Sequence, residues 1–162
     1  MSVTGYSRAQ IRLHWAVVVL LVLQYVLSGW IADAFEQGVQ AGTMRLTPGA
    51  IVHMVGGALI LLLAFWRLAL RQELGAPPPP EADPPWQKAL ARGTHLTLYA
   101  LLILLPVTGG VAWGTASAGA AVVHGLLKTL LLLVIALHVV GALYGQFVQR
   151  SGVLARMMRP GG

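Results

Sequence analysis

Histidine is the residue type through which this chain could do chemistry. All five histidines lie within or at the edge of long apolar stretches: His14, His53, His95, His124 and His138. An ionisable side chain in hydrocarbon is costly in free energy, so each is a candidate functional residue. Taken singly, an imidazole in such a place could make a structural hydrogen bond between helices, relay a proton, or bind a metal or haem iron.

Cysteine is absent from the sequence. Its absence excludes disulfide frameworks, zinc-thiolate sites, iron-sulfur clusters and a cysteine nucleophile. No set of nucleophile, base and orienting group is apparent, and there is no phosphate-binding loop, which argues against hydrolysis and phosphoryl transfer. Any chemistry must therefore use histidine, carboxylates, tyrosine or a cofactor.

The spacing of two histidines suggests two sites on one helix. His124 and His138 are fourteen residues apart. At about 100° and 1.5 Å per residue, their imidazoles face nearly the same way, offset by only ~40°, and lie about 21 Å apart along the axis. That distance is too long for one metal ion and suits two cofactors stacked across a membrane.

The elements that must position these histidines are membrane helices. Hydrophobic residues make up 57% of the 162-residue chain and charged residues 10%, and the mean hydropathy is +0.74, which argues against a soluble globular enzyme. Four stretches are long enough to span a bilayer, and in lipid they must be helical. These predicted spans cover residues 13–31, 51–70, 96–113 and 126–148. We predict an all-α fold, an integral membrane four-helix bundle that forms a single domain over residues 1–162.

The distribution of positive charge predicts the orientation. Eleven Lys and Arg residues against five Asp and Glu give a net charge of +6, and nine of the eleven fall on one side of the predicted spans. The positive-inside rule then places both termini in the cytoplasm, together with a Pro-rich loop over residues 72–92. Membrane topology accounts for the basic balance, so we expect lipid as a partner and no nucleic acid.

Depth in the membrane then pairs four of the histidines. In this topology His14 and His138 lie toward the cytoplasmic face, whereas His53 and His124 lie toward the outer face. Two axial imidazoles can hold haem iron, so two haems would use four of the five histidines. A copper or zinc site is less favoured, because its three or four ligands would have to converge at one depth.

The residues together resemble the bacterial cytochrome b561 family, which consists of small four-helix dihaem membrane proteins and includes the superoxide oxidase type. The resemblance covers nearly the whole chain. It rests on Tyr6-Ser7-Arg8 and His14-Trp15 at the first span, His53 in the second, Arg67 and Arg71 before the Pro-rich loop, His95, Tyr99, Pro106 and Gly109 in the third, His124 and His138 in the fourth, and Arg156-Met157-Met158 in the tail.

The resemblance implies a ligand set, a location and a function. It implies that His14, His53, His124 and His138 are the axial ligands of two b-type haems, in agreement with the depth pairing. It further implies a multi-pass protein of the bacterial inner membrane that moves single electrons between the membrane quinone pool, with ubiquinone as substrate, and a donor or acceptor. Superoxide or a periplasmic redox partner would react on the outer side.

Four further charged or titratable residues are candidates for the sites. His95 fits a contact to a quinone carbonyl, a haem propionate or a proton path, and equally an interfacial hydrogen bond at a helix start. Lys128 follows His124 by one turn and could pair with an outer propionate or attract an anion, but a lysine that snorkels to the interface would look the same. Arg8 and Arg12 could contact inner propionates, although topology alone would place them there.

Three functional readings follow from the sequence. The leading one is a dihaem, quinone-linked oxidoreductase of the superoxide oxidase type, or a redox carrier of the same architecture. A second is a cytochrome b anchor subunit of a larger dehydrogenase or hydrogenase. A third, from a different class, is a haem-free transporter or scaffold whose histidines relay protons. The third explains the apolar spans but leaves the two-layer placement of four histidines to coincidence.

Overall fold

The protein is an all-helical bundle in a computed structural model that describes residues 5–161. Five α-helices follow one another along the chain: α1 (Arg8–Val26), α2 (Ser28–Ala41), α3 (Pro48–Leu74), α4 (Pro85–Thr115) and α5 (Ala118–Leu143). A π-helical turn (Tyr144–Val148) and a short 3₁₀ turn (Ala155–Met157) complete the described segment. Four helices are long and apolar enough to cross a membrane, namely α1, α3, α4 and α5 with its π-helical extension. The predicted four-span all-α class is confirmed.

The helix boundaries differ from the predicted ones at two connections. The first span ends at Val26 instead of residue 31, and α2 occupies most of the connection that follows it. This helix is amphipathic, with Ala34 and Gly38 buried and Asp33 and Glu36 exposed, so it lies against the bundle without entering it. The Pro-rich loop predicted over residues 72–92 is also too long, because only 75–84 lie outside the flanking helices.

The reason for the shorter loop is local. Apolar composition locates the hydrocarbon layer but not the end of a helix, and charged residues beyond the membrane continue α3 to Leu74. Four consecutive prolines from Pro77 then prevent helix formation, because proline lacks the N–H donor and disfavours the α region for the residue before it. Pro85 restarts the helix, since proline is well suited to the first helical turn.

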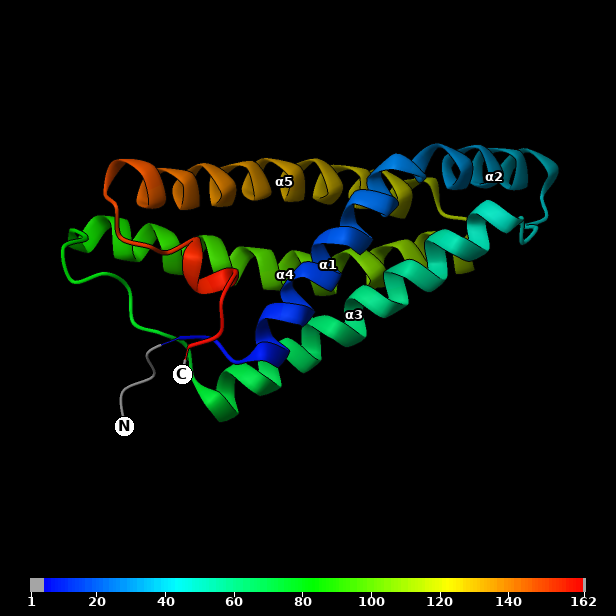
Figure 1. Cartoon of the computed structure of the whole chain (residues 1–162). Coiled ribbons are helices and arrows are strands. Elements are labelled where there is room, and N and C mark those ends of the chain that lie inside the picture. Colours follow the sequence, from blue (N-terminus) through cyan, green and yellow to red (C-terminus); the bar gives the residue numbers. More distant parts are fainter. Residues whose placement is uncertain (1–4, 162) are drawn as a thin grey trace.

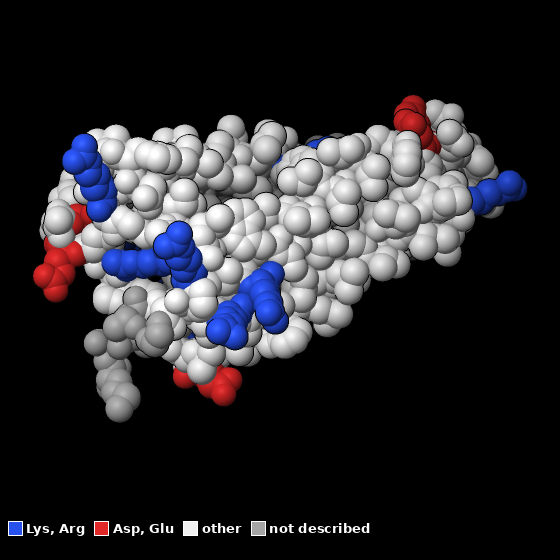
Figure 2. Space-filling model, in the orientation of Figure 1, with Lys and Arg blue, Asp and Glu red and all other residues white. Residues whose placement is uncertain are grey.

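The bundle consists of two helix pairs. Helix α1 packs along α3, and α4 packs along α5, while contacts between α3 and α4 join the two pairs (Figure 1). Within residues 5–161, α5 does not pack closely along α1 or α3. The apolar core at the centre combines Val17, Ile60, Ala64 and Leu102. Much of the remaining apolar surface is exposed, as expected for helices that face lipid, and most charged side chains gather toward the two ends of the molecule (Figure 2).

The two ends of the described segment meet at one end of the bundle, as expected for an even number of spans. The Gly161 amide donates to the Tyr6 carbonyl at 3.2 Å. The C-terminal segment also crosses this end, because the Trp15 indole donates to the Met157 carbonyl at 2.9 Å and Arg156 donates to the Pro78 carbonyl at 2.9 Å. These contacts tie the tail to α1 and to the Pro-rich loop, which also lies at this end (Figure 1).

Gln10 joins the start of α1 to the end of α3, and its replacement by leucine should destabilise the fold. The buried amide closes the capping box with Ser7 and donates to the Gly75 carbonyl at 2.9 Å. Losing these bonds should cost about 1–3 kcal/mol, or roughly 2–12 °C in the unfolding midpoint for a chain of this size. The measurement is thermal unfolding of the detergent-solubilised protein. Gln40→Leu is the matched control, because the exposed Gln40 side chain bonds to Glu36 within the same helix and joins no two elements in the described part of the chain. Equal midpoints for both variants would contradict the assignment.

Candidate functional site

The structure brings both predicted histidine pairs together. The ring centroids of His14 and His138 are 6.3 Å apart with an interplanar angle of 63°, and those of His53 and His124 are 6.4 Å apart at 73°. We call these the inner pair and the outer pair, after the predicted orientation. All four side chains are only partly buried. Helix α5 contributes one histidine to each pair, whereas α1 supplies the inner partner and α3 the outer one.

The separation within each pair fits two imidazoles on opposite sides of one metal atom. A metal–nitrogen bond of about 2 Å, followed by about 1.1 Å from nitrogen to ring centre, places the two centroids roughly 6.2 Å apart. Among residues 5–161, no three His, Asp or Glu side chains converge as a group that could hold a metal ion. The donors therefore come as pairs, which is the ligand set of a six-coordinate haem iron and not of a tetrahedral zinc.

The His124 ring is held by α4. Its Nδ1 lies 3.0 Å from the Leu105 carbonyl and 3.2 Å from the Thr108 hydroxyl. Pro106 lies inside this helix, and the Thr108 hydroxyl lies within hydrogen-bond distance of the Leu104 and Leu105 carbonyls, one turn earlier in α4. A histidine whose Nδ1–H donates to a carbonyl presents the lone pair of Nε2 to a metal, so these contacts orient the ring for ligation.

Gly109 lets α4 approach this ring. A Cβ atom at position 109 would lie 3.1 Å from Cε1 and 3.2 Å from Nδ1 of His124, closer than ordinary van der Waals contact allows. At Gly110 a Cβ would meet nothing within 4 Å. Only the first of these two adjacent glycines is therefore required by the packing around the outer pair.

The surroundings of His53 are different. Its Nδ1 is buried and has no hydrogen-bond partner in the described part of the chain. Its backbone carbonyl instead accepts a hydrogen bond at 2.8 Å from the side chain of Gln24 on α1. Gln24 and Thr108 are not among the residues predicted from the sequence. A polar residue inside an apolar span is the signal that could have found Gln24.

A third histidine joins the inner pair. The His95 ring centroid is 5.1 Å from that of His138, and its Nδ1 lies 2.6 Å from the Ala91 carbonyl one turn earlier in α4. His14 also contacts the Trp15 ring edge to face, with centroids 5.4 Å apart. Because α4 begins at Pro85, His95 does not lie at a helix start as the sequence suggested; its ring bonds one turn back within α4 and is part of the inner cluster.

One partly buried cation accompanies each pair. The Arg67 guanidinium lies 6.0 Å from the centre of the Tyr99 ring, and its positive charge acts on His14 and His138. Lys128 is partly buried and its charge acts on His53 and His124, while its backbone carbonyl accepts a 2.6 Å hydrogen bond from Tyr25. Arg8 and Arg12 are exposed at the start of α1.

Apolar side chains separate the two layers of histidines. Leu131 lies midway between His124 and His138 on α5 and is the largest fully buried side chain among the described residues. Val17, Ile60 and Leu102, one from each of the other three spanning helices, form a buried apolar cluster together with Ala64. The inner and outer clusters are therefore separate sites joined by one helix.

Comparison with known proteins identifies relatives of this chain. The chain is 35% identical to a protein named cytochrome b562 from Cereibacter sphaeroides, with 96% of each chain covered. It is 26% identical to cytochrome b561 homolog 1 of Escherichia coli, covering 94% of this chain and 96% of the relative. It is 25% identical to the probable superoxide oxidase CybB of Yersinia pestis, covering 94% of this chain and 95% of the relative.

A family model also matches almost the full length of the chain. The model is that of prokaryotic cytochrome b561, and the match extends over residues 5–160, which include all five histidines and the four spanning helices. The family is named for a b-type cytochrome, a class defined by bound haem b. This multi-pass membrane protein therefore belongs to the prokaryotic cytochrome b561 family.

Proposed function

We propose that the protein is a dihaem cytochrome of the bacterial inner membrane that carries electrons between the quinone pool and a reactant on the periplasmic side, with superoxide as the electron donor. The observation that carries the proposal is the presence of two facing imidazole pairs, 6.3 and 6.4 Å between centroids, at opposite ends of the bundle. One-electron transfer is the chemistry that haem supplies when bound. Both termini lie in the cytoplasm in this arrangement.

The four paired histidines are the proposed haem ligands. His14 and His138 would hold the inner haem, and His53 and His124 would hold the outer one. The Leu105 carbonyl keeps His124 in the tautomer that leaves Nε2 free for iron. The partly buried charges of Arg67 and Lys128 compensate the propionate carboxylates that a haem brings into each layer, because an unpaired carboxylate in a low-dielectric site would be costly. Arg8 and Arg12 remain proposed contacts for the inner propionates.

The quinone reaction needs protons as well as electrons. Two superoxide anions each give up one electron and leave as dioxygen, while one ubiquinone takes up two electrons and two protons to become ubiquinol. His95 lies at the predicted cytoplasmic end of α4 beside His138, where an imidazole can hold a proton close to the electron path. The 25% identical relative named as a probable superoxide oxidase supports this choice of donor.

The alternative of a proton relay across the membrane finds little support in these contacts. Between His124 and His138, the only polar side chains of α5 are Lys128 and Thr129, both near the outer end. The buried side chains at mid-depth, including Leu131, Ile60 and Leu102, can neither donate nor accept a proton. Electrons can tunnel through such a layer whereas protons cannot cross it without polar groups.

The ligand assignment predicts which variants lose haem. His124→Leu and His138→Leu should each lose one of two haems per chain, because a single remaining imidazole holds the iron weakly. His95→Leu should keep both haems, although its ring is close to His138. The measurement is a reduced-minus-oxidised visible spectrum with haem quantification on the purified protein. A colourless wild-type protein from haem-supplied cells, or an unchanged spectrum for His124→Leu, would refute the assignment.

The approach of α4 to the outer pair predicts different effects for two neighbouring glycines. Gly109→Val should push the His124 ring away from its partner and reduce the occupancy or shift the absorption of the outer haem alone. Gly110→Val should leave both haems unchanged, since its side chain would enter open space. Haem content and low-temperature visible spectra measure the difference. Equal behaviour of the two variants would show that the contact does not matter.

The proposed donor predicts a charge effect on one half-reaction. Lys128→Gln should slow reduction of the protein by superoxide roughly 5–10-fold, because it removes a positive charge beside the outer pair. Reduction by a soluble quinol should change little. Arg45→Gln is the control, since this exposed outer cation is distant in sequence from the histidines. Stopped-flow absorbance measures both rates. The choice of superoxide fails if superoxide does not reduce the wild-type protein or if Lys128→Gln slows both donors alike.

A further inference from the structure

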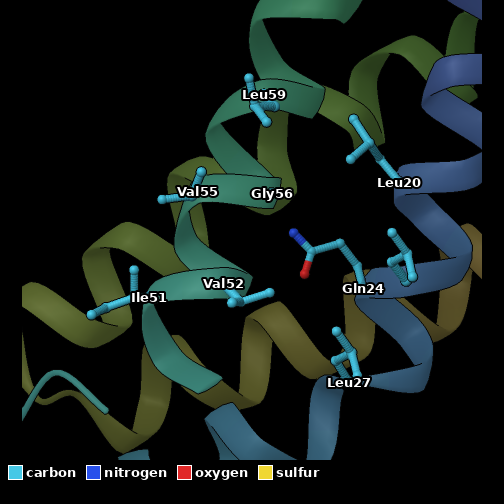
Figure 3. A pocket seen from close by; sticks show the side chains of 9 residues that line it. Leu20, Gln24, Leu27, Ile51, Val52, Val55, Gly56 and Leu59 are labelled. Carbon is cyan, nitrogen blue, oxygen red and sulfur yellow. The ribbon is translucent and has the colours of Figure 1, made fainter. Parts of the chain in front are cut away.

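Gln24 is a polar side chain in an otherwise apolar groove that faces lipid. The groove lies between α1 and α3, has a volume of about 320 Å³, and is lined besides Gln24 only by Leu, Ile, Val and Gly residues. Figure 3 shows the Gln24 side chain extending from α1 toward α3, level with Val52 and Gly56. An amide in such surroundings is costly unless it is hydrogen-bonded, so its retention there calls for a specific partner.

That partner is the main chain of His53. Gln24 Nε2 donates to the His53 carbonyl at 2.8 Å, across the interface between the two helices. Gly56 provides the room for this bond, because a Cβ atom at position 56 would collide with Nε2 of Gln24. At the neighbouring Gly57 a Cβ would be 3.9 Å from the same nitrogen, which is an ordinary contact. The absence of a side chain at Gly56 therefore leaves the space that the Gln24 amide occupies.

The two histidines of the outer pair are positioned by different means. The His124 ring is held at Nδ1 by the Leu105 carbonyl and the Thr108 hydroxyl. The His53 ring has no such support, since its Nδ1 lacks a partner among the described residues. The hydrogen bond near His53 is instead made by its backbone, whose carbonyl accepts from the Gln24 amide on α1.

We propose that Gln24 is the positioning residue for His53, and that it sets the ligand geometry of the outer haem. The inference rests on the proposed function, because it assumes that His53 and His124 bind iron. Without the Gln24 bond, the first turns of α3 can shift relative to α1, and His53 then presents its nitrogen to the iron less well. Loss of a hydrogen bond that orients a metal ligand weakens metal affinity by about 10–100-fold. The inner haem does not depend on this contact.

The first test uses a substitution that removes the donor without leaving a cavity. Gln24→Met keeps the length and approximate volume of the side chain but cannot donate a hydrogen bond. In the purified dihaem protein, we expect the outer haem to dissociate at least about tenfold more readily, and its midpoint potential and ferric electron paramagnetic resonance signal to shift. The inner haem should keep its potential and signal. A variant that loses only thermal stability, with both haems unchanged, or that alters both haems equally, would overturn the proposal.

The glycine pair provides a second test that does not alter the glutamine. Gly56→Ala should displace the amide and reproduce the change at the outer haem, whereas Gly57→Ala should resemble the wild type. In a Gln24→Ala background, Gly56→Ala should cause no further change, because the displaced group is already gone and the new methyl group enters the vacated space. Additive effects of the two substitutions, or equal effects of the two glycine variants, would contradict the mechanism. If Gln24→Met does not fold, the comparison of Gly56→Ala with Gly57→Ala still tests whether Gln24 positions His53.

The two proposals fail in different ways. A wild-type protein without haem would overturn the proposed function and this inference with it. A wild-type protein with two haems, whose outer haem is indifferent to Gln24→Met and Gly56→Ala, would overturn only the role of Gln24.

Discussion

The fixed distance between two imidazoles on one rigid helix is the constraint on which the rest of the structure depends. Because His124 and His138 share α5, their separation and relative direction are set by helix geometry alone. The fold must then bring one histidine from another helix to each of these two levels. It does so with α1 at the inner level and α3 at the outer level, which run in opposite directions and so carry their histidines near their respective starts.

Much of this arrangement could be predicted from the sequence, because it follows from hydropathy, charge and depth. The four spans, the all-α class and the proximity of His14 to His138 and of His53 to His124 needed no knowledge of side-chain packing. The details that hold the rings in place could not be predicted in the same way. The contact of His124 with Leu105 depends on how closely α4 and α5 pack at Gly109, and the fit of Gln24 over Gly56 depends on the packing of α1 against α3. Helix α2 was missed because its mixed composition resembles that of a connecting loop.

The apolar core of the bundle would serve the proposed function as well as the fold. Val17, Ile60, Ala64 and Leu102 form this core, and Leu131 is buried on α5 midway between its two histidines. A core of this kind keeps water and ions out of the centre of the bundle. If the two histidine pairs bind haem as proposed, the residues that stabilise the fold would also let electrons pass between the haems without protons.

The two sites are built unequally, and this inequality has a chemical meaning. At the outer pair, His124 has a carbonyl acceptor for Nδ1–H, which raises the basicity of the imidazole as a ligand, while His53 has none in the described residues. At the inner pair, a third histidine and the Arg67 charge lie beside the two facing rings. Basicity of the ligands and nearby positive charge both influence the reduction potential of a bound haem. If both histidine pairs bind haem as proposed, the different hydrogen bonds and charges around them would give the two haems different reduction potentials.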